Sequence, residues 1–396
     1  MGKARQAEMK AERIIGKIEG KAADPVVIFF GGIHGNEPSG IRALKYVFKQ
    51  LYAEEKSVRG TVYAVAGNLP ALSERVRFID HDLNRIWTEE TIEKIRHSPP
   101  ETLSVEEKEA LVLYNLISEL RTRHSGPFYF IDFHTTSSRT IPFITLSDSL
   151  INRKFSLLFP VPVVLGIEEY LKGALLSYAN QLGYVALAFE SGQHGEEEAV
   201  AHTIAFTYLC LVHCGCLRKE AVKGFKDYVH LLKTAARGKD TLYEVTGSYR
   251  VGSNERFKMF PGFESFEKVL RGSPLAESNG TLITAKRDMM LFMPLYQKQG
   301  AEGYFTIRKI PEFFLRLSAW LRHSGMDTLL TVLPGVSWEN AEREALLVNL
   351  RTARFLTKPF FHLLGYRSWQ VDKEHIRMIN RERRAKTKVY KKEAWY

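Results

Sequence analysis

The sequence is poor in cysteine and has no long hydrophobic run, and both absences limit what the protein can be. Its three cysteines among 396 residues all fall within residues 210–216, so the chain lacks the spread, even-numbered set of a disulfide framework. We therefore expect a reducing compartment and a cytoplasmic protein. No apolar run approaches the roughly 20 residues that a transmembrane helix needs, and the N-terminal residues lack the apolar core of a secretory signal.

The cysteines themselves have two interpretations. Cys210, Cys214 and Cys216 lie beside His213 and could form a small zinc knot, but no second Cys-x-x-Cys pair accompanies them. The alternative is a buried helix end whose thiols pack as small hydrophobic groups. The isolation of the cluster favours this second interpretation.

The net charge of +11 suggests a nucleic-acid partner, but its distribution argues against one. Residues 381–396 hold seven Lys or Arg against two Glu, which accounts for five of the eleven excess charges. The aromatic run at residues 128–130 belongs to an apolar segment and is expected in the core, not on a stacking platform. We therefore predict no nucleic-acid binding. The basic tail is expected to be solvated and mobile, with at most weak contact with anionic surfaces.

Short apolar runs alternate with amphipathic helical stretches between residues 26 and 235. The candidate strands are residues 26–30, 61–67, 128–134, 142–147, 161–166 and 184–190. They are almost continuously apolar, as strands covered on both faces tend to be. One helical stretch begins with Ser104 and Glu107, which fit a capping box. This alternation predicts an α/β protein with a doubly wound sheet flanked by helices, whose functional residues collect at the carboxyl ends of strands.

The composition and the hydrophobic pattern of the sequence change after this region. Residues 236–310 are rich in glycine, proline and short alternating runs, which predicts a smaller β-rich domain of hairpins. Residues 311–326 and 340–365 have helical patterns and precede the basic tail. We therefore predict a catalytic α/β domain over residues 1–235, a β domain over 236–310 and a helical extension over 311–396.

Histidine and carboxylate side chains follow several of the candidate strands. A catalytic zinc ion takes three protein ligands, typically two histidines and one carboxylate, and leaves a fourth position open. His34 and Glu37, three residues apart in a glycine-rich turn, can bind one ion, and His134 at the end of another strand would complete the set. Asp132, on the same strand, could orient an imidazole. Glu190, at the end of a further strand, is then available as the general base.

A basic and polar cluster, RFIDHDLNR, covers residues 77–85. Arg77 could polarise the scissile carbonyl and stabilise the oxyanion, while Asn84 and Arg85 could bind a substrate carboxylate. The alternative is that Asn84 caps a helix start and Arg85 is a salt-bridged surface residue, within a local charge network that includes Asp80 and Asp82. The residues alone do not decide between the two.

Four motifs in order, GGIHGNE, RFIDHDLNR, IDFHTT and FESG, resemble the succinylglutamate desuccinylase and aspartoacylase family, which is related to the zinc carboxypeptidases. The resemblance covers roughly residues 26–305 and implies a zinc-carboxypeptidase-like mixed sheet with a C-terminal β domain that overhangs the active site. It implies one Zn²⁺ per chain, with His34, Glu37 and His134 as its ligands. It also implies that Arg77 polarises the carbonyl, that Asn84 and Arg85 bind the substrate carboxylate, and that Glu190 is the proton shuttle.

Two positions concern the substrate. The family carries a substrate-binding arginine ten residues before the catalytic glutamate, whereas this chain has Asn180 there. The contact that reads a second carboxylate is therefore missing. The family also has a tyrosine that reaches the site from the C-terminal domain, and Tyr296 is the nearest candidate.

These features predict a zinc-dependent hydrolase that cleaves an amide bond, or alternatively an ester bond, of an N-acyl amino acid or a related carboxylate-bearing substrate. A carboxypeptidase-like metallopeptidase acting on short peptides is the alternative among enzymes. The alternative outside enzymes is a non-catalytic metal-binding scaffold, against which the presence of Glu190 and Arg77 argues. The acyl group, the amine, the oligomeric state and the role of the extension stay open.

Overall fold

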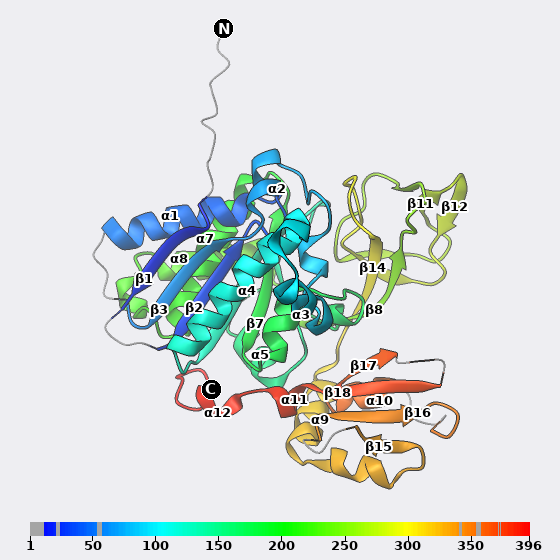
Figure 1. Ribbon diagram of the computed structural model, residues 1–396. Coiled ribbons are helices and arrows are strands. Elements are labelled where there is room, and N and C mark those ends of the chain that lie inside the picture. Colours follow the sequence, from blue (N-terminus) through cyan, green and yellow to red (C-terminus); the bar gives the residue numbers. More distant parts are fainter. Residues whose placement is uncertain are drawn as a thin grey trace.

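The computed structural model describes residues 12–20, 24–53, 58–339, 343–353, 358–370, 372 and 374–396, and an eleven-stranded mixed sheet runs through it (Figure 1). The strand order is β1-β3-β2-β4-β7-β5-β6-β8-β14-β13-β10. The strands are β1 (Ile14–Glu19), β2 (Val26–Gly31), β3 (Thr61–Ala66), β4 (Phe128–Thr136), β5 (Phe143–Leu146), β6 (Val163–Leu165), β7 (Val185–Gln193), β8 (Leu242–Arg250), β10 (Glu267–Val269), β13 (Met289–Phe292) and β14 (Glu302–Lys309). Strands β3, β2, β4 and β7 are parallel neighbours, which brings their carboxyl ends to one edge.

Helices cover both faces of this sheet, as predicted for a doubly wound α/β fold (Figure 1). Alternate residues of β2 enter different cores: Phe29 packs with Phe48 of α1 on one face, and Phe30 packs with Leu113 of α4 on the other. The helical elements of this part are α1 (Ser39–Ala53), α2 (Leu69–Glu74), η1 (Leu83–Arg85), α3 (Glu89–His97), η2 (Pro100–Thr102), α4 (Val105–Arg123), α5 (Leu150–Ser156), η3 (Ile167–Glu169), α6 (Leu175–Gln181), α7 (Glu197–His213), η4 (Lys219–Ala221) and α8 (Phe225–Ala235).

The six candidate strands form β2 to β7, which confirms them within a few residues. The capping box of α4 is also present, with Ser104 accepting from the Glu107 backbone and Glu107 accepting from that of Ser104. Strand β1 was not predicted, because its charged residues interrupt the apolar pattern. It pairs antiparallel with β3 at the edge of the sheet.

The β-rich segment over residues 236–310 is joined to the catalytic sheet. Strand β8 pairs parallel with β6, and β14, β13 and β10 extend the sheet from there. A separate three-stranded sheet contains β9 (Phe257–Met259), β11 (Pro274–Ser278) and β12 (Thr281–Thr284). The continuous sheet holds this segment beside the carboxyl ends of the catalytic strands.

The predicted helical extension over residues 311–396 is wrong for most of its length. Its first helix is present as α9 (Glu312–His323), but a four-stranded antiparallel sheet follows, in the order β15-β16-β18-β17. Residues 345–349 form its buried strand β16, because their short apolar run pairs on both sides and cannot be distinguished from a helix segment by periodicity. The remaining elements are η5 (Met326–Val332), β15 (Val336–Trp338), β16 (Ala345–Asn349), α10 (Lys358–Leu363), β17 (Tyr366–Gln370), β18 (His375–Asn380), α11 (Arg381–Arg384) and α12 (Thr387–Tyr390).

The basic tail is packed against the catalytic domain, so the expectation of a solvated, mobile terminus is also wrong. The buried Tyr390 hydroxyl donates to the Phe128 carbonyl and accepts from the Val185 amide. Trp395 donates to the Tyr129 hydroxyl. The aromatic residues of the tail therefore anchor it below the amino ends of β4 and β7 (Figure 1). Its arginines form ion pairs, for example Arg384 with Glu344.

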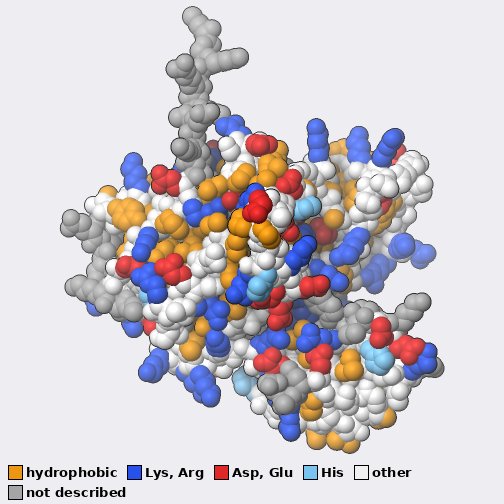
Figure 2. All heavy atoms as spheres, viewed as in Figure 1, with side chains coloured by type: hydrophobic (Ala, Val, Ile, Leu, Met, Phe, Trp, Pro, Cys, Tyr) orange, Lys and Arg blue, Asp and Glu red, His pale blue; other side chains and the backbone are white. Residues whose placement is uncertain are grey.

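Two further predictions concern burial. Cys210, Cys214 and Cys216 are buried free thiols at the end of α7, as the packing interpretation expected. Among the described helices, none is both long enough and apolar enough to cross a membrane. The surface carries both signs of charge interspersed across the face seen in Figure 2.

Candidate metal centre and active site

The three predicted metal ligands come together at the carboxyl ends of β2 and β4. Gly31 of β2 is paired with Phe133 of β4, so the loop after β2 lies beside the end of β4. The ligand atoms of His34, Glu37 and His134 all lie within 4.8 Å of one another, and the three residues are only 2 to 5% exposed. The sheet register thus brings together residues that are 100 positions apart in the chain.

The loop after β2 needs its glycines to reach this position. Gly32 has a φ of 66°, a left-handed conformation that side-chain-bearing residues rarely adopt. At Gly35 a Cβ atom would lie 2.0 Å from the backbone of Ala71, because α2 packs directly on the loop. The glycines around His34 therefore allow the close approach that places the imidazole in the site.

Each imidazole is oriented by carboxylates on both sides. The Nδ1 atoms of His34 and His134 lie 2.9 and 3.1 Å from the two oxygens of Glu37. On the opposite ring atoms, His134 Nε2 lies 2.6 Å from Asp132 and His34 Nε2 lies 3.1 Å from Asp82. Burial works to raise the pKa of Glu37, but His34 and His134 hold it well below its usual value. The ligating carboxylate is therefore anionic.

This donor set fits zinc. Two imidazole nitrogens and one carboxylate oxygen are a ligand combination that zinc takes in hydrolases. Carboxylates behind both histidines are the usual support for such ligands. Asp132 has the orienting position expected of it, whereas the matching role of Asp82 was missed. The sequence signal for Asp82 was its place in the polar cluster with Arg77, which had been considered only as a local charge network.

Glu190 enters the same cavity from β7, directly opposite His134 in the parallel register. It is 7% exposed, and its Oε2 atom has no hydrogen-bond partner within the described part of the chain. Burial raises the pKa of Glu190 to about 8, with the neighbouring Glu37 and Asp132 adding to the shift and His134 opposing it. A carboxyl group that titrates near neutral pH is suited to take up and return a proton.

Arg77 also lines the cavity and is held by acidic partners. Its Nε and Nη2 atoms donate to the same oxygen of Asp82 at 3.1 and 3.0 Å, and its Nη1 lies 3.6 Å from Glu37. The backbone amide of Arg77 donates to Gln299 of the β-rich segment. The guanidinium therefore lies beside the candidate metal ligands and is held in one orientation by Asp82.

Asn84 and Arg85 both line the cavity, and each makes a contact close to the alternative considered for it, a helix-start cap for Asn84 and a salt bridge for Arg85. Asn84 Oδ1 accepts from the Leu175 amide, which ties η1 to the start of α6. Arg85 Nη2 donates to Glu302 at 3.1 Å. Asp80 does not pair with Arg85; it accepts from the Val105 amide at the start of α4. No local pattern could have indicated Glu302, since it lies 217 residues from Arg85.

Tyr296 lies outside the cavity, contrary to its predicted reach into the site. Its side chain is 38% exposed. Its hydroxyl donates to the Phe260 carbonyl and accepts from the Phe263 amide, both within the β-rich segment. Met293 of this segment lines the cavity, and Gln297, Gln299 and Glu302 contact His194, the Arg77 amide and Arg85 respectively.

We expect Tyr296→Phe to change kcat/KM by less than about threefold, which corresponds to less than 1 kcal/mol. The substitution removes a hydroxyl whose two partners are backbone groups outside the cavity. Steady-state kinetics on any substrate that the wild type cleaves measures this effect. A loss of 100-fold or more would show that Tyr296 turns into the site during catalysis.

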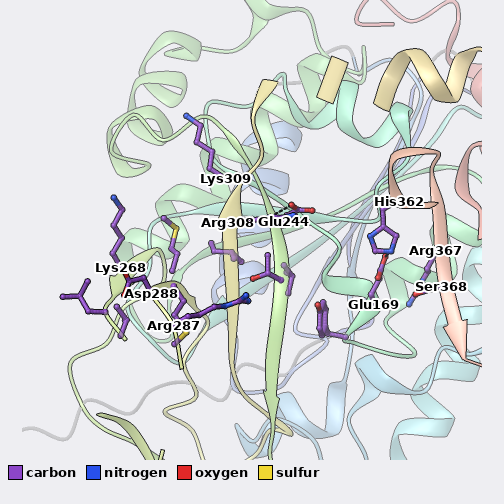
Figure 3. Close-up of a pocket in the computed structure, with 18 of the residues that line it drawn as sticks. Glu169, Glu244, Lys268, Arg287, Asp288, Arg308, Lys309, His362, Arg367 and Ser368 are labelled. Atoms are coloured by element: carbon purple, nitrogen blue, oxygen red, sulfur yellow. Dashed lines mark hydrogen bonds and ion pairs between the residues drawn. The ribbon is translucent and has the colours of Figure 1, made fainter. Parts of the chain in front are cut away.

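The catalytic cavity has a volume of about 100 Å³ and also contains Asn180, the position where the family carries an arginine. A much larger groove of about 940 Å³ lies between β8, β14 and the C-terminal sheet (Figure 3). None of the metal ligands lines that groove. The small cavity is therefore the candidate active site, because it alone of the two contains the metal ligands and Glu190.

The fold and this site define a mixed α/β protein with a possible metal centre of two histidines and one carboxylate at the carboxyl ends of parallel strands. Residues 23–206 match the family model of the succinylglutamate desuccinylase/aspartoacylase catalytic domain. The match spans the segment that carries the candidate metal ligands and Glu190.

Curated relatives and solved structures are similar to parts of this chain. The aspartoacylase of Xenopus tropicalis is 30% identical over 142 residues, which cover 36% of this chain and 42% of the relative. The N-acyl-aromatic-L-amino acid amidohydrolase (carboxylate-forming) of Xenopus laevis is 33% identical over 112 residues, 28% of this chain and 34% of the relative. The chain thus spans less than half the length of these two relatives. The crystal structure of succinylglutamate desuccinylase from Vibrio parahaemolyticus has a TM-score of 0.52 at 15% identity, covering 74% of this chain and 86% of that one.

Proposed function

We propose that the protein is a zinc-dependent hydrolase that cleaves the amide bond of an N-acyl amino acid. The convergence of His34, Glu37 and His134 with Glu190, whose Oε2 atom has no hydrogen-bond partner among the described residues, in one buried cavity carries this proposal. The relatives named as an aspartoacylase and an N-acyl amino acid amidohydrolase support the substrate class.

The protein side chains divide the chemistry between them. A zinc ion held by His34, Glu37 and His134 would supply Lewis-acid activation of water and of the scissile carbonyl. Glu190 takes a proton from the attacking water and returns it to the leaving amine. Arg77 donates hydrogen bonds to the carbonyl oxygen as negative charge develops there, and Asn84 with Arg85 binds the substrate carboxylate. For Arg85 this requires that the substrate share or displace Glu302.

The shape of the site favours a small substrate over a peptide. The cavity of about 100 Å³ accommodates few atoms. The β-rich segment contacts the loops that follow β2 and β7 through Gln297. The Gln297 side-chain oxygen accepts from Asn36 and lies 3.2 Å from His194. Gln299 adds a hydrogen bond to the Phe78 carbonyl. A site bounded in this way should lose efficiency with peptide length, which separates a deacylase from a carboxypeptidase-like enzyme.

Metal removal and reconstitution test the proposal. We expect about one zinc per chain by elemental mass spectrometry, loss of N-acyl amino acid hydrolysis after chelation, and recovery with added zinc. His134→Ala should lose the metal, whereas His213→Ala should keep it, because His213 lies at the end of α7 and contacts Phe159. Absence of zinc would contradict the proposal. Zinc without hydrolysis of any N-acyl amino acid or peptide would favour the non-catalytic scaffold.

A further inference from the structure

One end of the catalytic cavity is closed by the C-terminal part of the chain. Ser147, Ser177 and Asn180 line both the catalytic cavity and a second cavity of about 50 Å³. Arg381 and Arg384 of α11 border that second cavity. The metal ligands and Glu190 line only the catalytic cavity. The end marked by Asn180 is therefore the one directed away from the metal ligands and toward the C-terminal segment.

The arginines at the cavity are already neutralised by carboxylates of the protein. Arg77 is paired with Asp82, and Arg85 is paired with Glu302. At the closed end, Arg381 Nη2 lies 2.8 Å from Glu168 and 3.1 Å from Glu169. A substrate carboxylate at this end would have to compete with these buried anions.

Asn180 does not replace the missing arginine as a donor. Its Nδ2 atom donates to the Leu176 carbonyl at 2.8 Å, one turn earlier in α6. Its Oδ1 atom accepts from Asn152, whose side chain also donates to the Ser147 carbonyl. The Asn180 amide thus holds α6 and α5 together. It has no positive charge to attract a second carboxylate, and its donor is already bound to the Leu176 carbonyl.

Glu168 presents the opposite chemistry at the same end. It lines the cavity, is 4% exposed, and its Oε1 atom accepts from Arg381. Its Oε2 atom is buried without a hydrogen-bond partner among the described residues. A buried acceptor without a donor is costly, and a donor on the ligand would remove that cost. Arg381 holds the carboxylate in place, since its Nη1 also donates to the Tyr366 carbonyl.

We propose that Glu168 selects substrates whose group farthest from the scissile bond donates hydrogen bonds, a carboxamide or an ammonium, and that this end of the cavity rejects a carboxylate. The selection rests on the proposed function of the same site. It reverses the preference that an arginine at position 180 would give. It also makes the C-terminal segment part of the specificity pocket, because Arg381 positions the reading carboxylate.

Isosteric substrate pairs test this selection in the zinc-loaded full chain. N-acetylglutamine against N-acetylglutamate varies the amine side, and N-succinamoylglycine against N-succinylglycine varies the acyl side. We expect the carboxamide of at least one pair to be preferred by about 10- to 100-fold in kcat/KM, the range of a lost hydrogen bond to a charged group. Glu168→Gln should bring that ratio close to one. A carboxylate preference, or no preference in either pair, would overturn the proposal.

Glu169→Gln is the matched control. Glu169 also pairs with Arg381, but it faces the outer groove, where it lies 3.1 Å from His362 (Figure 3). If Glu168 acted only by supporting Arg381, both variants would change the ratio equally. We expect the ratio to change in Glu168→Gln alone. Should the wild type cleave none of the four compounds, calorimetric binding of the same pairs decides the selection, with tighter carboxamide binding expected. The proposed function is tested separately, by zinc content and by hydrolysis of other N-acyl amino acids.

Discussion

Glu190→Gln is expected to lower kcat/KM by about 100- to 10,000-fold, the range that a positioned general acid–base contributes. The carboxamide has nearly the same shape but cannot accept the proton of water or pass it to the leaving amine. The carboxyl lies in register with His134 and has an unpartnered oxygen in the cavity. The replacement therefore removes proton transfer and leaves the three metal ligands in place.

Three measurements separate this loss from damage to the site. The zinc content of Glu190→Gln should equal that of the wild type, and its thermal midpoint should not be lower, since a neutral group in this buried position carries no ionisation cost. Glu198→Gln, an exposed position in α7, should retain full activity. A Glu190→Gln variant that keeps both its zinc and its rate would remove Glu190 from the mechanism and leave the base unassigned.

The grouping of His34, Glu37 and His134 could be predicted from sequence because these residues lie next to strands that are locally encoded. The apolar runs of β2, β4 and β7 can be recognised in the sequence as buried strands, and parallel strands bring their carboxyl ends together. His34, His134 and Glu190 follow directly from that rule. Asp82 illustrates its limit: the residue was noticed, but its contact with His34 depends on how η1 folds back over the site.

The contacts that shape specificity could not be read in this way. Glu302 and Arg381 lie more than 200 residues from their partners Arg85 and Glu168, and nothing local to either residue indicates the pairing. Tyr296 was predicted to reach the site from its position in the chain, but that position did not determine where its side chain points. Long-range packing of the β-rich and C-terminal segments decides these positions.

The C-terminal segment was misassigned for a related reason. The apolar residues of 345–349 have no helical or strand signature until β15 and β18 pair with them. Likewise the charge of the tail suggested a solvated terminus, whereas its aromatic residues decide its position. The buried ion pairs between this segment and the catalytic domain make the docking strong enough to test by mutation.

Arg322→Ala is expected to lower the free energy of unfolding by about 3 to 5 kcal/mol, because it removes the ion-pair partner of Glu382 and leaves the buried Asp148 with Arg153 alone. Arg322 of α9 has a fully buried side chain that lies 2.7 Å from Asp148 of the β5–α5 loop and 3.0 Å from Glu382 of α11. It also donates to the carbonyls of His362 and Leu363. One guanidinium thus joins α9, α10, α11 and the catalytic domain.

Arg316→Ala on the same helix is the control. Its side chain is 82% exposed and pairs only with Glu312 one turn away, so we expect a change below about 1 kcal/mol. Chemical denaturation at pH 7 compares the two variants, and Arg322→Met provides a second, bulkier replacement if Arg322→Ala does not fold. Equal midpoints for the Arg316 and Arg322 variants would contradict a stabilising role of this network.

The pH dependence gives an independent check on the same contact. Burial works to raise the pKa of Asp148, but Arg153 and Arg322 hold it well below its usual value. A carboxyl with a depressed pKa contributes stability above its unfolded value of about 4, and that contribution is lost as the pH falls through the folded value. The wild type should therefore lose stability on acidification below about pH 4. Arg322→Met, whose Asp148 retains Arg153, should lose somewhat less over the same range, because the part of the contribution that depends on Arg322 is already absent at neutral pH.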